Sequence, residues 1–170
     1  MMTLEPLDTT DLGDKYEDWV RFIARTHHAA NPRTNQVAPF TPLSKPLSDS
    51  RVALLTTAGA HLDDQAPFQV ATVAGDHTYR LIPDDVELGR LRFTHTHYDT
   101  SSAEQDPNVV IPLDRLHELV ERGRVGSASP VHVGMMGFNP DPTGVADELA
   151  PAVAGVLLEA QVDVAILVPG

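Results

Sequence analysis

Apolar runs and amphipathic stretches alternate along residues 51–170. Continuous apolar runs are typical of strands that are covered on both faces of a parallel sheet. Val52–Thr56 is such a run, and the largely apolar segments Val131–Met136 and Val162–Val168 are predicted to be further strands. Between them, Asp114–Arg122 and Val145–Gln161 have the apolar spacing of helices, the second interrupted at Pro151. This order of strands and helices favours right-handed crossovers and predicts an α/β fold with an open, mostly parallel, doubly wound sheet.

Other segments of this region carry weaker patterns. Leu91–His97 alternates strictly between apolar and polar positions, which predicts a strand whose alternate side chains share one face. Phe68–Val73 is a candidate for an additional strand, and Pro83–Asp85 is predicted to be a turn. Polar residues that follow the predicted strands are expected at the edge of the sheet where ligands bind in open α/β folds.

The first fifty residues differ in character. Leu12–Thr26 is predicted to be one amphipathic helix. Ala29–Ser50 holds four prolines, a density that excludes helix and central strand, so an extended arm is predicted. We expect the arm to lie against its own domain or a neighbouring protomer, which predicts a homo-oligomer. The chain therefore divides into residues 1–50, a helix and proline-rich arm, and residues 51–170, an α/β domain.

Composition narrows the classes of function. The 170 residues carry a formal net charge of -12, which argues against binding to nucleic acid or to anionic membranes. No apolar run approaches the length of a membrane span, and the amino terminus lacks the pattern of a signal peptide, so we expect a cytoplasmic protein. The chain has no cysteine, which excludes disulfides and thiolate ligands within it.

The most reactive side chains lie in the segment His95-Thr96-His97-Tyr98-Asp99. If the segment is a strand, His95, His97 and Asp99 project from one face. Imidazole and carboxylate groups suit a divalent metal such as zinc, iron or manganese, with His61 as a further ligand. The same groups could instead bind substrate through hydrogen bonds, act as acid and base, or pack structurally. We take the three as candidate catalytic residues and leave these roles open.

Several motifs recur in order along residues 51–170. They are Ala58-Gly59-Ala60-His61 with Asp64-Gln65, Gly75-Asp76-His77-Thr78-Tyr79-Arg80, His95-Thr96-His97-Tyr98-Asp99, Pro112-Leu113-Asp114-Arg115-Leu116 and Gly134-Met135-Met136-Gly137. Together they resemble the glycine/sarcosine/betaine reductase selenoprotein B family, which includes a D-proline reductase subunit. The resemblance implies an oxidoreductase that acts with redox partner subunits on a small amino-acid-type substrate, cleaving a carbon–nitrogen bond reductively. It implies these substrate-binding residues: Gly59, His61, Asp64, His77, Tyr79, Arg80 and Met135.

In fuller members of that family, the strand that matches Val162–Val168 leads into a loop with selenocysteine or cysteine. This chain ends at Gly170, before such a loop. Three explanations remain open: an in-frame UGA codon read as a stop, so that selenocysteine is lost by truncation; a naturally short relative with different chemistry; or a sequence that covers part of the protein. Two other functions compete with the reductase, a metal-dependent lyase or hydrolase and a non-catalytic subunit of a reductase assembly.

Overall fold

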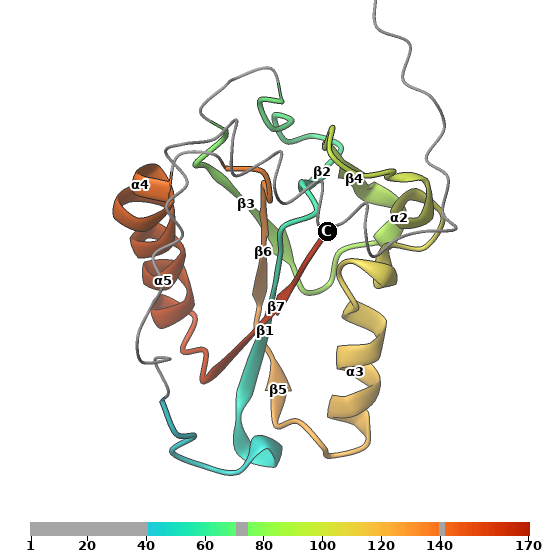
Figure 1. Ribbon diagram of the computed structural model, residues 1–170. Coiled ribbons are helices and arrows are strands. Elements are labelled where there is room, and N and C mark those ends of the chain that lie inside the picture. The colour runs from blue at the N-terminus through green and yellow to red at the C-terminus, as the bar shows by residue number, and fades with distance from the viewer. Residues whose placement is uncertain (1–40, 71–74, 140–141) are drawn as a thin grey trace, which may run out of the picture. The chain divides into compact units, whose positions relative to one another are not determined.

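A computed structural model describes residues 41–70, 75–139 and 142–170 (Figure 1). These residues belong to one compact unit, Asn35–Gly170. The helix predicted at Leu12–Thr26 and most of the predicted arm lie outside the described residues. The described end of the arm has no regular structure up to Pro46 and then forms the short 3-10 helix η2, Leu47–Asp49.

A mostly parallel sheet of five strands forms the centre of the unit, as the apolar runs predict. Its strands are β1 (Arg51–Thr56), β3 (Tyr79–Pro83), β5 (Ser127–Ala128), β6 (Val131–Met135) and β7 (Val164–Val168). β1 pairs in parallel with β5 and β6 along one side and with β7 along the other, because Leu55 lies opposite both Val133 and Leu167. β3 pairs antiparallel with β6. β7 and β3 are therefore the outer strands.

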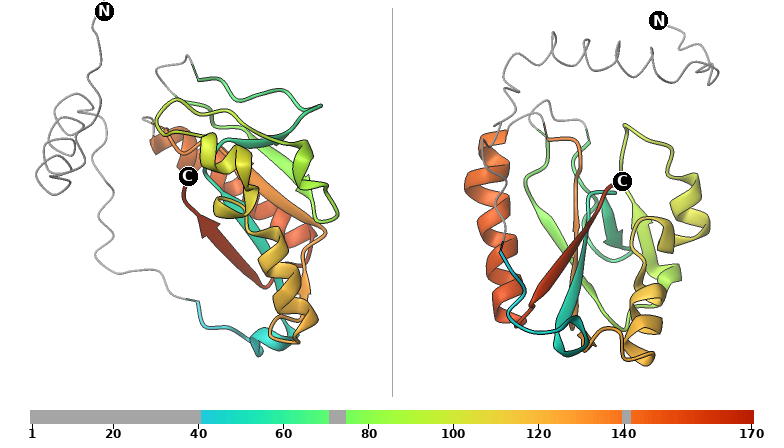
Figure 2. Two further views of the ribbon diagram at one scale, coloured as in Figure 1. Left: turned by 90° about the vertical axis from the view of Figure 1, so that its right-hand side faces the viewer. Right: turned by 60° about the horizontal axis from the view of Figure 1, so that its bottom comes forward.

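Helices cover both faces of this sheet (Figure 1; Figure 2). On one face lie α4 (Pro142–Gly144), the π-helical turn η5 (Val145–Leu149) and α5 (Ala150–Glu159). On the other lie α3 (Leu113–Glu121) and the shorter α2 (Ser101–Gln105). The core accordingly forms two clusters, one around Leu54 and Leu113 and the other around Val133 and Val153. The fold is a mixed α/β fold.

The helix predicted over Val145–Gln161 is present and changes type next to its proline. The π-helical turn Val145–Leu149 ends just before Pro151, which stands in the first turn of α5. Proline has no N–H to donate, so it suits the first turn of a new helical segment. Leu149 and Val153 are buried against the sheet, as the predicted apolar stripe requires.

The strand predicted at Leu91–His97 is wrong beyond Phe93. The strand β4 spans Leu91–Phe93 and pairs antiparallel with β2, Ala60–Leu62, in a separate two-stranded sheet. Its alternation is real, since Leu91 and Phe93 are buried and Arg92 is exposed. After the Thr94 N–H donates to Gly59 O at 3.0 Å, the chain leaves the sheet. His95 and His97 consequently lie in a loop, and the shared-face argument does not hold for them.

Sequence patterns also missed strands. β2 is only three residues long, and β3 contains Arg80 and ends at Pro83, so neither has a continuous apolar run. Residues 68–70, the described part of the candidate strand Phe68–Val73, are not in a strand. The predicted turn is present at Asp84 and Asp85, although Pro83 itself still pairs with β6.

Candidate functional site

The loop Thr94–Asp99 is tied to the carboxyl ends of the central strands. The Tyr98 hydroxyl donates to Ala58 O, just beyond β1, at 2.9 Å. The His97 ring stacks on Phe138, just beyond β6, with 3.7 Å between ring centroids. The loop therefore bridges the ends of two neighbouring parallel strands, where open α/β sheets bind ligands.

The end of β7 reaches the same place. The Thr57 N–H donates to Val168 O at 3.1 Å, and the Gly170 N–H donates to the Thr57 hydroxyl at 3.1 Å. A Cβ added to Gly170 would lie 2.4 Å from the Ala58 Cα, so Gly170 packs directly on the residue that anchors Tyr98. Residues at the ends of β1, β6 and β7 thus meet next to the loop Thr94–Asp99, which we name the histidine loop.

His95 is held as a neutral imidazole. Its Nδ1 accepts the His97 backbone N–H at 3.0 Å, so in the neutral ring the proton is on Nε2. Burial, with a smaller contribution from the charge of His97, lowers the pKa of His95 below its ordinary value. The His95 ring lies 4.7 Å from that of Tyr98 and 5.8 Å from that of His97. The Nε2–H of His95 is therefore a hydrogen-bond donor beside aromatic rings.

The Asp99 side chain forms a hydrogen bond with the first turn of the following helix, α2. Its Oδ1 accepts the Ser101 backbone N–H at 3.0 Å at the start of α2, and this bond lowers the pKa of the Asp99 carboxyl. The side chain is exposed. Within the described segments, no group of three or more His, Cys, Asp or Glu side chains is placed to hold a metal ion. The metal set of His95, His97, Asp99 and His61 is not assembled, and the lyase or hydrolase reading is not favoured.

His61 is a buried residue that positions the loop. Its Nδ1 donates to Leu62 O at 2.8 Å, so its Nε2 accepts the Thr94 hydroxyl proton at 2.8 Å. Both ring nitrogens are occupied, and Thr94 directly precedes His95. His61 therefore acts on the candidate site through Thr94.

Asp64 lies apart from this loop. It forms an exposed ion pair with Arg90 at 2.8 Å, and Arg90 also binds Asp63 at 2.8 Å. The hydrogen bond from Arg90 lowers the pKa of Asp63. These groups brace the turn after β2.

Arg80 and Asp76 order the segment before β3. The Arg80 guanidinium lies 4.4 Å over the Phe68 ring and donates to Ala66 O at 2.7 Å. Asp76 is buried, which by itself raises its pKa, but hydrogen bonds from Gln69 and Thr78 outweigh burial and lower it. Asp76 thus accepts from backbone N–H groups, and the Arg80 guanidinium donates mainly to backbone carbonyls, so both side chains are engaged in ordering this segment.

The remaining predicted residues lie on the α5 side. Met135 is buried opposite Tyr79 in the β3–β6 register. The His77 ring packs against Gly144, where an added Cβ would lie 2.1 Å from it. Among described residues, the His77 Nε2 and the Asn139 Oδ1 are buried polar atoms without a hydrogen-bond partner.

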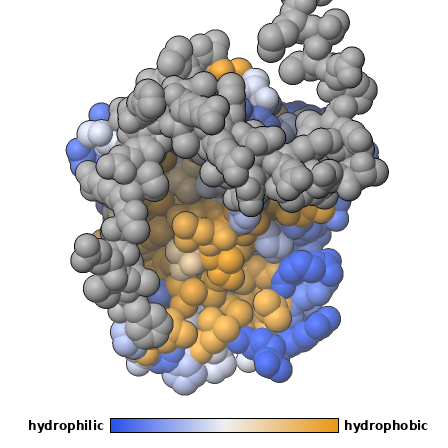
Figure 3. Space-filling view, in the orientation of Figure 1, coloured by the Kyte–Doolittle hydropathy of each residue, from blue (hydrophilic) through white to orange (hydrophobic). Residues whose placement is uncertain are grey.

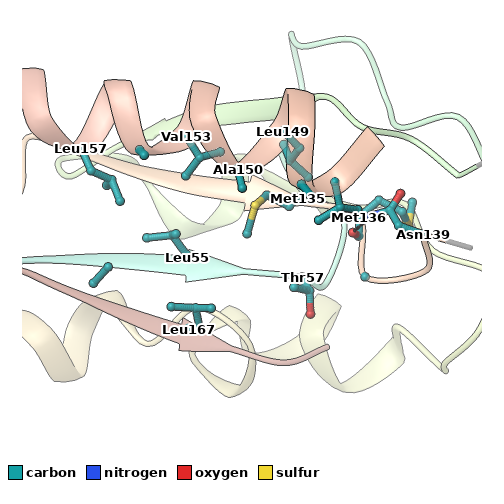
Figure 4. A pocket seen from close by; sticks show the side chains of 15 residues that line it. Leu55, Thr57, Met135, Met136, Asn139, Leu149, Ala150, Val153, Leu157 and Leu167 are labelled. Carbon is teal, nitrogen blue, oxygen red and sulfur yellow. Dashed lines mark hydrogen bonds between the residues drawn. The ribbon is translucent and has the colours of Figure 1, made fainter. Parts of the chain in front are cut away.

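A hollow of about 670 Å³ opens between α5 and the sheet (Figure 4). Its walls are almost entirely apolar and include Leu55, Met135, Val153 and Leu157. Thr57 and Asn139 line the end of the hollow that lies next to the carboxyl ends of β1 and β6. The lining suits side chains of another element better than a small polar ligand.

Sequence reasoning missed residues that the structure brings into play. The sequence patterns assign no role to Phe138, yet its ring stacks on that of His97. His132 lies within β6 and is fully buried. Its Nε2 and the His117 Nε2 both donate to Asp84 Oδ1, at 2.9 and 2.8 Å. A histidine within an apolar run, with an aspartate in a turn, was the available signal.

The glycines of the motifs meet backbone. Gly59 has φ of +69°, and a Cβ added to it would lie 2.1 Å from Thr94 O. A Cβ on Gly134 would lie 1.9 Å from Ala60 O. At both glycines, the space that a side chain would need is occupied by the backbone of a neighbouring segment. Gly59 and Gly134 let the segment after β1 cross β6 and carry the histidine loop.

Taken together, the fold and the loop define an α/β domain with a candidate ligand site at the carboxyl ends of its parallel strands. The model of the glycine/sarcosine/betaine reductase selenoprotein B family matches residues 25–169, and the chain belongs to this family. The resemblance carried by the motifs is thereby confirmed. In the described residues, no helix has both the length and the apolar character needed to cross a membrane.

Two curated relatives share the family. The D-proline reductase subunit gamma of Acetoanaerobium sticklandii is 33% identical over 131 residues, which cover 77% of this chain and 53% of that protein. The betaine reductase complex component B subunit beta of Peptoclostridium acidaminophilum is 30% identical over 97 residues, covering 56% of this chain and 22% of that protein. The matched parts are about half and a fifth of these relatives. No solved structure matches the chain.

Proposed function

We propose that this chain is a substrate-binding part of a selenoprotein B-type reductase and that the loop Thr94–Asp99 contacts the substrate. Family membership and the position of the loop support the proposal. The substrate is a small amino-acid-type zwitterion, the class to which the names of the relatives point. We assign the contacts with this substrate to His95, His97 and Tyr98.

The chemistry of the loop suits such a zwitterion. The Nε2–H of His95 is available to donate to a carboxylate, and its neutral ring does not repel a substrate ammonium group. Tyr98 and Phe138 contribute aromatic rings, which attract substituted ammonium groups through their faces. The observation that carries the proposal is the clustering of these rings at the strand ends.

The selenium or sulfur atom that the reductive reaction requires is not supplied by these 170 residues. The 170 residues contain no cysteine, so no thiolate among them can attack the substrate. We propose that partner subunits of a reductase assembly, or protein sequence outside these residues, supply the selenium or sulfur. A catalytic role of Asp99 also remains a proposal. One oxygen of its carboxylate already accepts the Ser101 N–H.

Calorimetric titration with betaine and D-proline tests the substrate site. We expect the wild type to bind at least one of them, and His95→Ala and His97→Ala each to weaken binding tenfold or more while circular dichroism stays unchanged. His117→Ala is the matched control, because it removes a half-exposed histidine on α3 and should bind like the wild type. Unchanged binding in both loop variants, or no binding by the wild type, would overturn the proposal.

A further inference from the structure

The strand β7 has an open side. It pairs with β1 along one side and with no other strand of the described residues along the other. Leu167 is 68% exposed and Ile166 is 43% exposed, although strands of parallel sheets are normally covered on both faces. An open strand of this kind is a template for pairing with another chain.

The open side continues into the apolar hollow beneath α5. Leu167 and Ala165 of β7 form one wall of the hollow, and Leu157 and Ala154 of α5 belong to the opposite wall (Figure 4). On α5, Leu158 is 75% exposed. Figure 3 shows a broad apolar surface on this side of the molecule. Strand, hollow and helix thus form one apolar surface, which we name the β7 surface.

The strand and the walls of the hollow carry no charged side chain among residues 164–168 and the residues that line the hollow, in contrast to the chain as a whole. The chain carries a net charge of -12, so two copies repel each other over most approaches. Asp163, at the start of β7, is neutralised by Lys45 at 2.7 Å and accepts the Arg51 N–H at 2.8 Å. Residues 164–168 contain no charged side chain. Two β7 strands can therefore pair without bringing unpaired carboxylates of either strand together.

We propose that the β7 surface binds a second copy of this chain. The β7 strands pair antiparallel across a two-fold axis perpendicular to the sheet, which joins two sheets into one. This axis leaves both α5 helices on the same face, where the exposed Leu158 of each helix approaches the hollow of the other copy. An isologous contact of this kind requires only a surface that is complementary to itself, and a short apolar strand satisfies that condition.

Analytical ultracentrifugation of the 170-residue chain over a range of concentrations tests the proposal. We expect a monomer–dimer equilibrium. Leu167→Lys and Leu158→Glu should each raise the dissociation constant tenfold or more, because each buries a charge in the dimer and is exposed in the monomer. Val109→Lys is the matched control, since Val109 is 54% exposed on the 3-10 helix η4 (Pro107–Val109) and should leave the equilibrium unchanged.

Amide hydrogen exchange locates the contact. In the dimer, amides of residues 164–168 should exchange at least tenfold more slowly than in Leu167→Lys under the same conditions. A chain that stays monomeric at every concentration would overturn the proposal and leave the β7 surface to a different polypeptide. A dimer that forms equally well in both charge variants would also overturn it. Neither result bears on substrate binding at the histidine loop, so the two proposals fail separately.

Discussion

Gly134 illustrates how a single missing side chain positions the candidate site. The β6 backbone at this residue passes so close to Ala60 that an added Cβ would lie 1.9 Å from the Ala60 carbonyl oxygen. Ala60 begins β2, whose partner β4 leads into the histidine loop. The glycine therefore sets the distance between the central sheet and the segment that carries His95.

Gly134→Ala should lower the free energy of unfolding by roughly 3 kcal/mol, the cost of overpacking a closed site. Urea denaturation followed by circular dichroism measures this change. Gly89→Ala is the control, because a Cβ at Gly89 meets nothing within 4 Å and the change should stay under about 1 kcal/mol. Equal stability of the two variants would show that the crossing at Gly134 is not tight.

The sequence motifs identified several polar residues near the site but did not predict their hydrogen-bond partners. The motifs drew attention to His61, His77 and Arg80, but the pattern of residues does not reveal hydrogen-bond partners. His61 has both ring nitrogens occupied, and Arg80 donates to backbone carbonyls. Only the folded chain shows that the His95 Nδ1 accepts a backbone N–H two residues away, which places the ring proton on Nε2.

At the scale of elements, a side chain completes the sheet between β1 and β6. β1 pairs with β5 at Val52 and with β6 at Leu55, and the Leu54 N–H in between donates to the His132 Nδ1 at 2.9 Å. The other ring nitrogen of His132 donates to Asp84, whose carboxylate also accepts from His117. Burial lowers the pKa of His132, against the opposing effect of Asp84. The neutral His132 ring therefore takes the place of a backbone acceptor in the hydrogen bonding between β1 and its neighbouring strands.

This arrangement predicts acid-sensitive stability. As the pH falls below about 6.5, the ordinary pKa of histidine, the unfolded chain takes up a proton that folded His132 resists. The stabilisation is complete above that pH and is lost as the pH falls through the lowered pKa of His132. The free energy of unfolding, measured in urea from pH 8 to pH 5, should therefore decrease toward pH 5.

His132→Gln should flatten this pH profile while lowering stability at pH 7. Part of the slope should remain, because burial lowers the pKa of His95 in the same direction. Ile82→Val, opposite His132 in the register, is the control that weakens the core and keeps the wild-type slope. A slope as steep in His132→Gln as in the wild type would contradict the assignment.

The elements with strong periodicity were predictable, and the short ones were not. The apolar runs located β1, β6 and β7, and the proline located the change of helix type before α5. Leu91–His97 failed because alternation continues in the sequence after the backbone has left the strand. The antiparallel position of β3 depends on long-range pairing with β6, for which a single strand carries no local signal.

At the scale of the whole molecule, the domain presents two separate surfaces. The histidine loop lies at the carboxyl ends of the strands, and the β7 surface lies along the side of the sheet. The family model matches residues 25–169, while the chain spans 53% of its D-proline reductase relative. Substrate binding at the first surface and pairing of copies at the second are therefore independent proposals about one domain.

We propose above all that the histidine loop contacts an amino-acid-type substrate. Two-dimensional NMR of the 170-residue chain during addition of betaine or D-proline tests it most directly, since it reports on each residue separately. We expect saturable chemical-shift changes concentrated at His95, His97, Tyr98 and Phe138. Changes confined to the apolar hollow, or none with either ligand, would contradict substrate contact at this loop.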